Sequence, residues 1–227
     1  MLYRLYCYTQ KETNMNIQDN IIKRNLKNVI FICGTACGGK TTMARLLAEK
    51  HNLYLYDMDK MYEDHRDIAN EKFQPDMCYH MKDFHEQWTR PTEEQARWNM
   101  NSLREQTEMV LVDLMTLSRN QKVVADVLYS PIYTKEILDY HQLVFLTVDK
   151  SVIRKVYFDR PEKREFYDFV AKQELSHLYF ENIFQGLELT NELEQAQMKV
   201  SGLFLYERKS TDTQESVLRL LEEHFNL

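Results

Sequence analysis

The chain has 227 residues, with 29 lysine and arginine residues against 35 aspartate and glutamate residues and a formal net charge of −6. This length suits one large domain with a substantial core, and a composition of 44% apolar and 28% charged residues excludes a disordered chain. The acidic balance gives no broad electrostatic reason to bind nucleic acid or an anionic membrane, and no run of 18 apolar residues is present to cross a bilayer.

Residues 1–27 show no clear hydrophobic period, so we predict an N-terminal extension before a domain at residues 28–227. Met15 offers an alternative start, and whether residues 1–14 belong to the native protein stays open. The first apolar stretch is too short for a signal peptide. The four cysteines lack the paired spacing of zinc sites and indicate reduced thiols. We therefore expect a cytoplasmic protein.

A glycine-rich loop follows the first predicted strand, the apolar run at residues 28–33, and precedes a predicted helix at 41–51. The loop fits the pattern G-x-x-x-x-G-K-[ST], in which backbone N–H groups surround a phosphate chain. Lys40 reaches the β- and γ-phosphates in this pattern, and the Thr41 hydroxyl binds Mg²⁺. A plain glycine turn would explain the glycines but not the lysine and threonine. The predicted nucleotide-binding residues are Gly34, Thr35, Ala36, Cys37, Gly38, Gly39, Lys40, Thr41 and Thr42.

The rest of the chain alternates short strand patterns with helical ones. Further strands are predicted at residues 53–57, 122–128, 142–149 and 203–208. Between them we predict short helices at 60–91, a long helix from residue 92 with a Thr92 and Gln95 capping box, a helix near residue 151, helical structure over 164–199 and a last helix capped by Asp212 and Glu215. Strands separated by helices predict an α/β doubly wound, parallel five-stranded sheet with helices on both faces.

With this loop and this order of elements, residues 28–226 resemble the small P-loop kinases, a group that includes nucleoside monophosphate kinases and shikimate kinase. The resemblance implies a P-loop NTPase fold of the kinase type, with ATP and Mg²⁺ as cofactors. It also implies a helical acceptor-binding insertion at 60–118 and a lid region at 154–170.

Three aspartates are candidates for the reaction centre. The segment LYLYDMDKMY resembles the Asp-x-Asp of shikimate-kinase-like enzymes, and in an extended chain Asp57 and Asp59 would point to the same side. The resemblance implies a metal role for Asp57 and a general-base role for Asp59, although which of the two is the base stays open. Asp126, at the end of KVVADVL, resembles the Walker B aspartate of the Mg²⁺ shell. The alternative for each is a turn residue.

The resemblance also implies roles for two further sets of residues, one in the lid region and one in the acceptor-binding insertion. Arg154, Arg160, Lys163 and Arg164 form a basic cluster where these kinases carry a lid, and we predict that Arg160 and Arg164 stabilise the transferring phosphoryl group. A solvated helix face is the alternative. The acceptor insertion contains Trp88, Arg90, Arg97 and Trp98 beside His80 and His85. These residues suit stacking and anion binding or, alternatively, packing. The histidine spacing does not predict zinc.

These features predict an ATP- and Mg²⁺-dependent kinase for a small acceptor such as a nucleotide, nucleoside, sugar or other hydroxyl compound. One alternative is a nucleotide-binding P-loop NTPase with a regulatory role, against which the chain lacks the Asn-Lys-x-Asp motif of GTPase switches. Another is a kinase of nucleic-acid ends, which the negative charge disfavours. We expect no membrane partner, and a monomer and a homodimer remain equally open.

Overall fold

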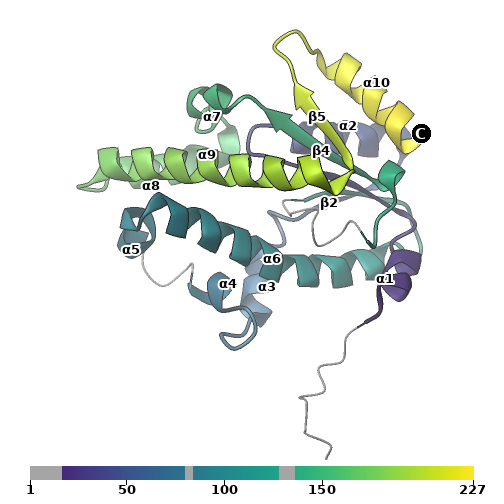
Figure 1. The fold of residues 1–227 in the computed structure, drawn as a ribbon, viewed down its shortest axis with the longest axis horizontal. Coiled ribbons are helices and arrows are strands. Elements are labelled where there is room, and N and C mark those ends of the chain that lie inside the picture. Colours follow the sequence, from purple (N-terminus) through teal and green to yellow (C-terminus); the bar gives the residue numbers. More distant parts are fainter. Residues whose placement is uncertain (1–16, 80–83, 128–135) are drawn as a thin grey trace, which may run out of the picture.

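The computed structural model describes residues 17–79, 84–127 and 136–227. The strands are separated by single helices or by runs of several helices (Figure 1). In chain order the elements are α1 (Asp19–Asn25), β1 (Val29–Gly34), α2 (Lys40–His51), β2 (Tyr54–Asp57), α3 (Tyr62–Ile68), α4 (Pro75–Tyr79), α5 (Phe84–Thr89), α6 (Thr92–Leu117), β3 (Val123–Asp126), the 3-10 helix η2 (Tyr140–Gln142), β4 (Leu143–Val148), α7 (Lys150–Val156), the 3-10 helix η3 (Pro161–Lys163), α8 (Arg164–Ala171), α9 (Ser176–Ser201), β5 (Phe204–Arg208) and α10 (Gln214–Phe225).

The five strands form one parallel sheet in the order β2-β3-β1-β4-β5. The predicted five-stranded, doubly wound architecture is therefore confirmed. All strands run the same way, so their carboxyl ends meet at one edge, where open α/β sheets bind ligands. In the register of β2 and β3, Asp57 lies opposite Asp126 at that edge.

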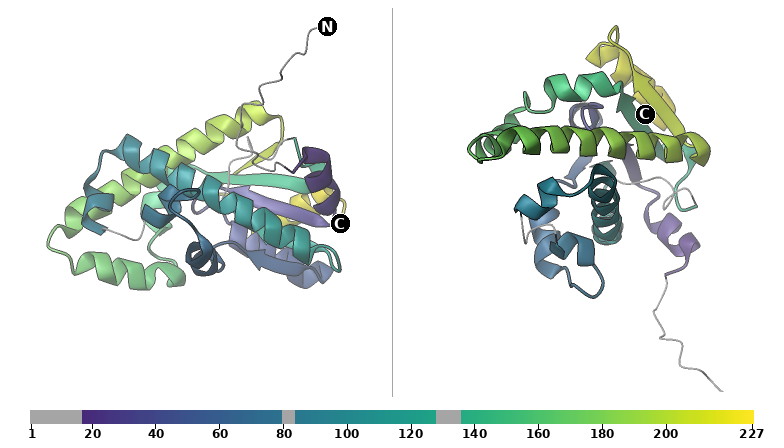
Figure 2. Two further views of the ribbon diagram at one scale, coloured as in Figure 1. Left: turned by 90° about the horizontal axis from the view of Figure 1, so that it is seen from below. Right: turned by 60° about the vertical axis from the view of Figure 1, so that its left-hand side comes forward.

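Each face of the sheet has its own apolar core, because successive side chains of a strand point to opposite faces. Phe31 and Phe145 belong to the core beneath α6 and α9. Ile32 and Val144 belong to the core beneath α2 and α10. Figures 1 and 2 show the long helices α6 and α9 side by side on one face of the sheet. The β1 residues are buried on both sides, as a continuous apolar run predicts.

Both predicted helix caps are wrong. The N-cap of α6 is Pro91, and Thr92 instead donates its hydroxyl to Gln185 Oε1 on α9, 3.1 Å away. The last helix is capped one residue later than predicted, by Thr213 and Ser216 in a reciprocal capping box. Asp212 accepts instead from the Lys209 backbone N–H in the preceding turn. In such polar stretches the sequence spacing allows the helix to begin at either of two neighbouring residues. Contacts with other parts of the chain decide which of them is the N-cap.

Part of the predicted N-terminal extension packs against the domain. Leu26, after α1, is fully buried in the core beneath α6 and α9. Its carbonyl accepts from Gln142 Nε2 at 3.0 Å. Residues 1–16, which include Met15, and residues 128–135, which include the end of the predicted third strand, lie outside the described residues. Within the described residues, no helix combines the length and the apolar character that crossing a membrane requires.

Candidate active site at the phosphate loop

The loop between β1 and α2 depends on its glycines, as Gly34 and Gly39 show. A Cβ atom at Gly34 would stand 1.9 Å from the Leu146 carbonyl oxygen of β4, so only glycine lets the loop leave the strand there. Gly39 has φ +90°, in the left-handed region, and is the N-cap of α2. It has no side chain to cap the helix, so the N–H groups of the first turn, Lys40 to Thr42, lack a side-chain acceptor. Such a turn is an anion-binding site.

Side chains behind the loop hold its shape. The Lys40 ammonium, on a side chain that is nearly buried, donates to the Thr35 carbonyl at 2.9 Å. The Thr35 hydroxyl bonds to the Thr147 hydroxyl of β4 at 3.2 Å. Cys37 has φ 63°, a strained value for a residue with a side chain, of the kind that collects at functional sites. The loop is therefore pre-shaped with its lysine in place.

A buried carboxylate and a hydroxyl meet beside Lys40. The Thr41 hydroxyl donates to the Asp126 carboxylate, which is 6% exposed at the end of β3. Burial raises the pKa of Asp126 to about 6; the Lys40 ammonium and the Thr41 hydrogen bond oppose this rise, and Asp59 and Asp57 add to it. The fold thus brings together Lys40, Thr41 and all three predicted aspartates.

The expected geometry of Asp57 and Asp59 is wrong. Strand β2 ends at Asp57, and the following residues form a turn in which the Asp59 N–H donates to Asp57 Oδ1 at 3.2 Å. The two side chains are therefore not related by strand alternation. Asp57 also pairs with Lys60, at 3.3 Å, while the Asp59 side chain is exposed.

Helix α6 holds this turn in position through a buried polar network. Gln106 donates to the Met58 carbonyl, between the two aspartates, at 3.2 Å. Its amide also contacts His65, which bonds to Asp113 at 2.9 Å. Asp113 in turn accepts from the Tyr56 hydroxyl of β2 at 2.8 Å. The network fixes where the carboxylates of the turn lie relative to the loop.

Two of the four basic residues predicted for the lid lie near the loop. Arg160 acts electrostatically on Cys37 of the loop, donates to the Tyr157 carbonyl at 3.1 Å and stacks over the Tyr157 ring. It also pairs with Glu162 at 3.7 Å. Burial lowers the pKa of Lys163, while the neighbouring Asp59 raises it and Arg160 and Lys40 lower it further. Lys163 therefore lies near enough to the candidate base Asp59 for their charges to interact.

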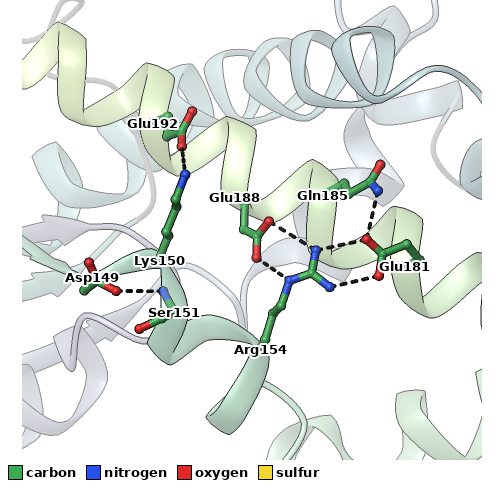
Figure 3. A network of polar contacts seen from close by, with 8 residues as sticks. All are labelled: Asp149, Lys150, Ser151, Arg154, Glu181, Gln185, Glu188 and Glu192. Atoms are coloured by element: carbon green, nitrogen blue, oxygen red, sulfur yellow. Dashed lines mark hydrogen bonds and ion pairs between the residues drawn. The ribbon is translucent and has the colours of Figure 1, made fainter.

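The other two basic residues point elsewhere. Arg154 makes a two-sided ion pair with Glu181 and Glu188, which ties α7 to α9 (Figure 3). Arg164 is exposed and pairs with Asp168 at 3.4 Å, one turn along α8. The structure does not bring Arg164 to the loop, and its catalytic role stays a prediction.

The aromatic and arginine residues predicted to bind the acceptor mostly pack. The indole of Trp98 is buried and donates to the Asp76 carbonyl at 3.1 Å. Arg90 stacks over the rings of Tyr79 and Trp98. Trp88 packs in the aromatic cluster of α5 and α8, beside Phe166. Only Arg97 of these four is exposed without an ion pair among the described residues. His85 bonds to Tyr179, and His80 lies outside the described residues.

Three residues that sequence reasoning missed reach the loop from the last third of the chain. Asn191 of α9 accepts from the Ala36 N–H at 3.4 Å. Glu194, one turn further, is 5% exposed, and the Lys40 ammonium lies near enough to lower its pKa. Arg208, at the end of β5, lies over Gly39, where an added Cβ would be 2.3 Å from Nη1. In the sequence, the three-residue spacing of the polar residues Asn191 and Glu194 was only a weak sign that they share one face of a helix. No feature of the sequence pointed to Arg208.

Glu194 gives the stability of the protein a pH dependence. Burial raises the pKa of this carboxyl to about 7, and Lys40 opposes the rise. Between the unfolded pKa near 4.5 and the folded pKa near 7, the native state binds more protons at Glu194 than the unfolded state does. The contribution of this group to stability is therefore largest below about pH 4.5 and is lost as the pH rises through 7. We expect this group to cost up to about 3 kcal/mol at pH 8. Urea unfolding should therefore show Glu194→Gln gaining stability over the wild type between pH 5 and pH 8.

The control for this experiment is Glu108→Gln, at an exposed position of α6. The two variants must be compared because burial also raises the pKa of Asp126. Asp126 therefore also makes the free energy of unfolding fall as the pH rises. If the free energy of unfolding depends on pH in Glu194→Gln as it does in Glu108→Gln and in the wild type, burial does not raise the pKa of Glu194.

The residues around Asp126 fit Mg²⁺. Within the described ranges, no three histidine, cysteine or carboxylate side chains converge to hold a metal unaided. Mg²⁺ does not need such a cage, since it keeps waters and is bound by one or two carboxylates together with substrate phosphates. The oxygen donors of Thr41, Asp126 and Asp57, beside a loop shaped for phosphate, match that preference.

Comparison with known proteins agrees with this fold. The chain matches the AAA domain family over residues 30–173, from β1 to just past α8. Together with the parallel sheet, this match confirms the resemblance to small P-loop kinases at the level of the fold. A search of curated proteins found no match.

Three solved structures are similar to this chain. Shikimate kinase from Acinetobacter baumannii in complex with shikimate is 15% identical, with a TM-score of 0.48, over 87% of this chain and 93% of that one. Shikimate kinase from Bacteroides thetaiotaomicron is 18% identical, with a TM-score of 0.46, over 88% and 98%. Dephospho-CoA kinase from Campylobacter jejuni is 12% identical, with a TM-score of 0.43, over 88% and 98%. Similarity at this level concerns the fold and identifies no substrate.

Proposed function

This chain belongs to the AAA domain family, and from that premise we propose that it is an ATP- and Mg²⁺-dependent kinase of a small-molecule hydroxyl acceptor. The observation that carries the proposal is the grouping of carboxylates beside the phosphate loop. A loop with Lys40 would serve any P-loop NTPase. The turn with Asp57 and Asp59, which α6 holds through the Met58 carbonyl, adds a candidate base, and Lys163, which interacts electrostatically with Asp59, adds a cation.

In the proposed reaction the acceptor oxygen forms a bond to the γ-phosphorus of ATP, and the bond from that phosphorus to the β,γ-bridging oxygen breaks. Asp59 accepts the proton of the acceptor hydroxyl, and ADP is the leaving group. Lys40 and the first-turn N–H groups of α2 hold the phosphates. Arg160 and Lys163 place positive charge near the transferring group.

Thr41 and Asp126, with Asp57, are the residues that would hold Mg²⁺, which neutralises charge on the phosphate oxygens when bound. We propose that residues 60–118 carry acceptor contacts and residues 154–170 form a lid, as the resemblance implies.

The proposal is tested by the dependence of ATP turnover on an added acceptor. The protein is incubated with ATP, Mg²⁺ and pools of nucleosides, monophosphates, sugars and amino-glycosides, and transferred phosphate is followed by mass. We expect turnover to rise with one pool. Slow hydrolysis that ignores every pool would favour the regulatory NTPase instead, and phosphate transferred only to a 5′-hydroxyl oligonucleotide would favour the kinase of nucleic-acid ends.

The Mg²⁺ site gives a separate prediction. Asp126→Asn and Thr41→Val should each raise the Mg²⁺ concentration for half-maximal rate about tenfold, since each removes one oxygen contact to the metal shell. The measurement is a Mg²⁺ titration of the rate at saturating ATP. Thr116→Val is the control, because its hydroxyl bonds only within α6, to the Val112 carbonyl. A titration midpoint that stays at the wild-type value in both variants would remove Thr41 and Asp126 from the metal site.

A further inference from the structure

Arg208, the last residue of β5, directs its side chain at the phosphate loop. Strand alternation puts it on the same face of the sheet as Phe204 and Tyr206, which pack against the core beneath α2 and α10. The guanidinium lies against the amino end of α2, where Nη1 is 2.3 Å from the position that a Cβ atom of residue 39 would take. Gly39 thus leaves room at the loop for an arginine from the edge strand of the sheet.

The guanidinium lies there without an anionic partner. The Arg208 side chain makes no hydrogen bond or ion pair with any residue that the structure describes, and its Nε is buried without an acceptor. The Asp212 carboxylate interacts with Arg208 through charge, but its hydrogen bonds are to the Lys209 N–H and the Tyr206 hydroxyl. A buried donor without an acceptor costs free energy, and an anionic ligand would recover that cost.

The charge next to Arg208 is unfavourable as well. The amino end of a helix carries partial positive charge, and the N–H groups of the first turn of α2 have no side-chain acceptor because Gly39 is the N-cap. A guanidinium beside this end is repelled unless an anion lies between the two. Positive groups from α2 and from β5, which are far apart in the sequence, therefore meet where an anion would bind to both.

The order of the strands indicates which part of ATP would lie near Arg208. Asp126, which accepts from the Thr41 hydroxyl, ends β3 on one side of β1, whereas β5 lies on the other side, beyond β4. With Lys40 and Mg²⁺ at the β- and γ-phosphates, the γ-phosphate lies toward β3 and the rest of the nucleotide extends toward β5. The phosphate next to the ribose is then the one within reach of Arg208.

The next step rests on the proposed function. We propose that Arg208 is a nucleotide-binding residue and that it binds the α-phosphate of ATP, which is not transferred and which ADP retains. A guanidinium suits this role because its planar fork can bond to two phosphate oxygens at once. The contact is the same in the ground state and in the transition state, so Arg208 contributes to nucleotide affinity and not to the rate at saturating ATP.

The test is equilibrium binding by calorimetry in the presence of Mg²⁺, with an unreactive ATP analogue and with ADP as probes. We expect Arg208→Ala to weaken the binding of both probes about tenfold or more, the cost of a lost charge-assisted hydrogen bond. Arg208→Lys should recover part of the loss, since it keeps the charge but not the fork. The control, Arg219→Ala, removes the same charge from an exposed position of α10 and should bind both probes as the wild type does.

Each other outcome overturns the proposal. A loss for the ATP analogue but not for ADP would place Arg208 at the transferred phosphate. A loss for both probes that Arg208→Lys does not reduce at all would indicate that the guanidinium stacks on the base. Wild-type affinity in Arg208→Ala, an equal loss in Arg219→Ala, or a wild type that binds neither probe would leave Arg208 without a role in nucleotide binding. Urea unfolding of the same samples shows whether each variant is folded.

The binding measurements need no acceptor, which keeps the two proposals apart. If Arg208→Ala weakens both probes but no acceptor pool receives phosphate from ATP, Arg208 stands as a nucleotide contact and the kinase proposal fails. If phosphate is transferred and Arg208→Ala binds both probes as the wild type does, the kinase proposal stands and this one fails. Where both hold, Arg208→Ala should raise the KM for ATP about tenfold and change the rate at saturating ATP less than about twofold.

Discussion

Lys40→Ala is expected to lower the rate of phosphoryl transfer about a thousandfold while the protein stays folded. The ammonium is placed where negative charge develops on the phosphates, and removal of one such pre-positioned group costs about a hundred- to a thousandfold in rate. Its structural contribution is small by comparison. The Thr35 carbonyl that accepts from Lys40 also accepts from the Gly38 N–H, at 3.2 Å, so it keeps a partner in the variant. We expect a loss of stability of about 1 kcal/mol.

The measurement is acceptor-dependent ATP turnover, with urea unfolding on the same samples. Lys50→Ala is the matched control, because it lies on the same helix at the end far from the loop, where its ammonium pairs with Glu222. Loss of Lys40 should also raise the pKa of Glu194 and Asp126 further, since it opposes the rise in both. A folded Lys40→Ala protein that turns over ATP at the wild-type rate would refute the phosphate-loop assignment.

Asp59→Asn should lower the rate at saturating substrates by about a hundredfold or more, the usual cost of losing a general base. The KM for ATP should change less than twofold, because in the proposed reaction the Asp59 carboxylate accepts the proton of the acceptor hydroxyl and does not bind ATP. Stability should hardly change, since Asp59 is exposed and contributes its backbone N–H, not its carboxylate, to the turn. Steady-state kinetics with both substrates varied separates these effects.

Asp67→Asn, at an exposed position of α3, is the control for the loss of one surface carboxylate. Asp57→Asn is the informative partner. Its side chain lies opposite Asp126 in the sheet register, so we expect it to shift the Mg²⁺ titration more than the maximal rate. The opposite result would be a rate for Asp59→Asn within twofold of the wild type and a large loss of rate for Asp57→Asn. It would make Asp57 the general base instead of Asp59.

The sequence by itself determined the parts of this protein that depend on local patterns. The glycines, Lys40 and Thr41 lie within eight consecutive residues, so their geometry follows from one loop between a strand and a helix. Alternating strand and helix patterns were enough for the parallel sheet, because buried parallel strands read as apolar runs, as residues 29–33 do. The order of the strands in space was not readable from these patterns.

Only the tertiary structure decided which charged residues take part in the site. Four basic residues look alike in sequence: Arg154, Arg160, Lys163 and Arg164. Arg154 pairs with carboxylates on α9 and Arg164 with one on α8, whereas Arg160, although it pairs with Glu162, and Lys163 lie near the loop. The four residues differ in the direction in which their helices present the side chains and in the distant segments that they contact. The spacing of residues along the sequence predicts neither.

The same reason separates Glu194 from the other acidic residues of the chain. Its burial, and its place beside Lys40, exist only because α9 crosses the sheet next to a loop 154 residues earlier in the sequence. In the unfolded chain it is an ordinary glutamate that is ionised at neutral pH, and in the folded chain desolvation raises its pKa to about 7. Sequence determines which side chains are present, and packing determines which of them lose water.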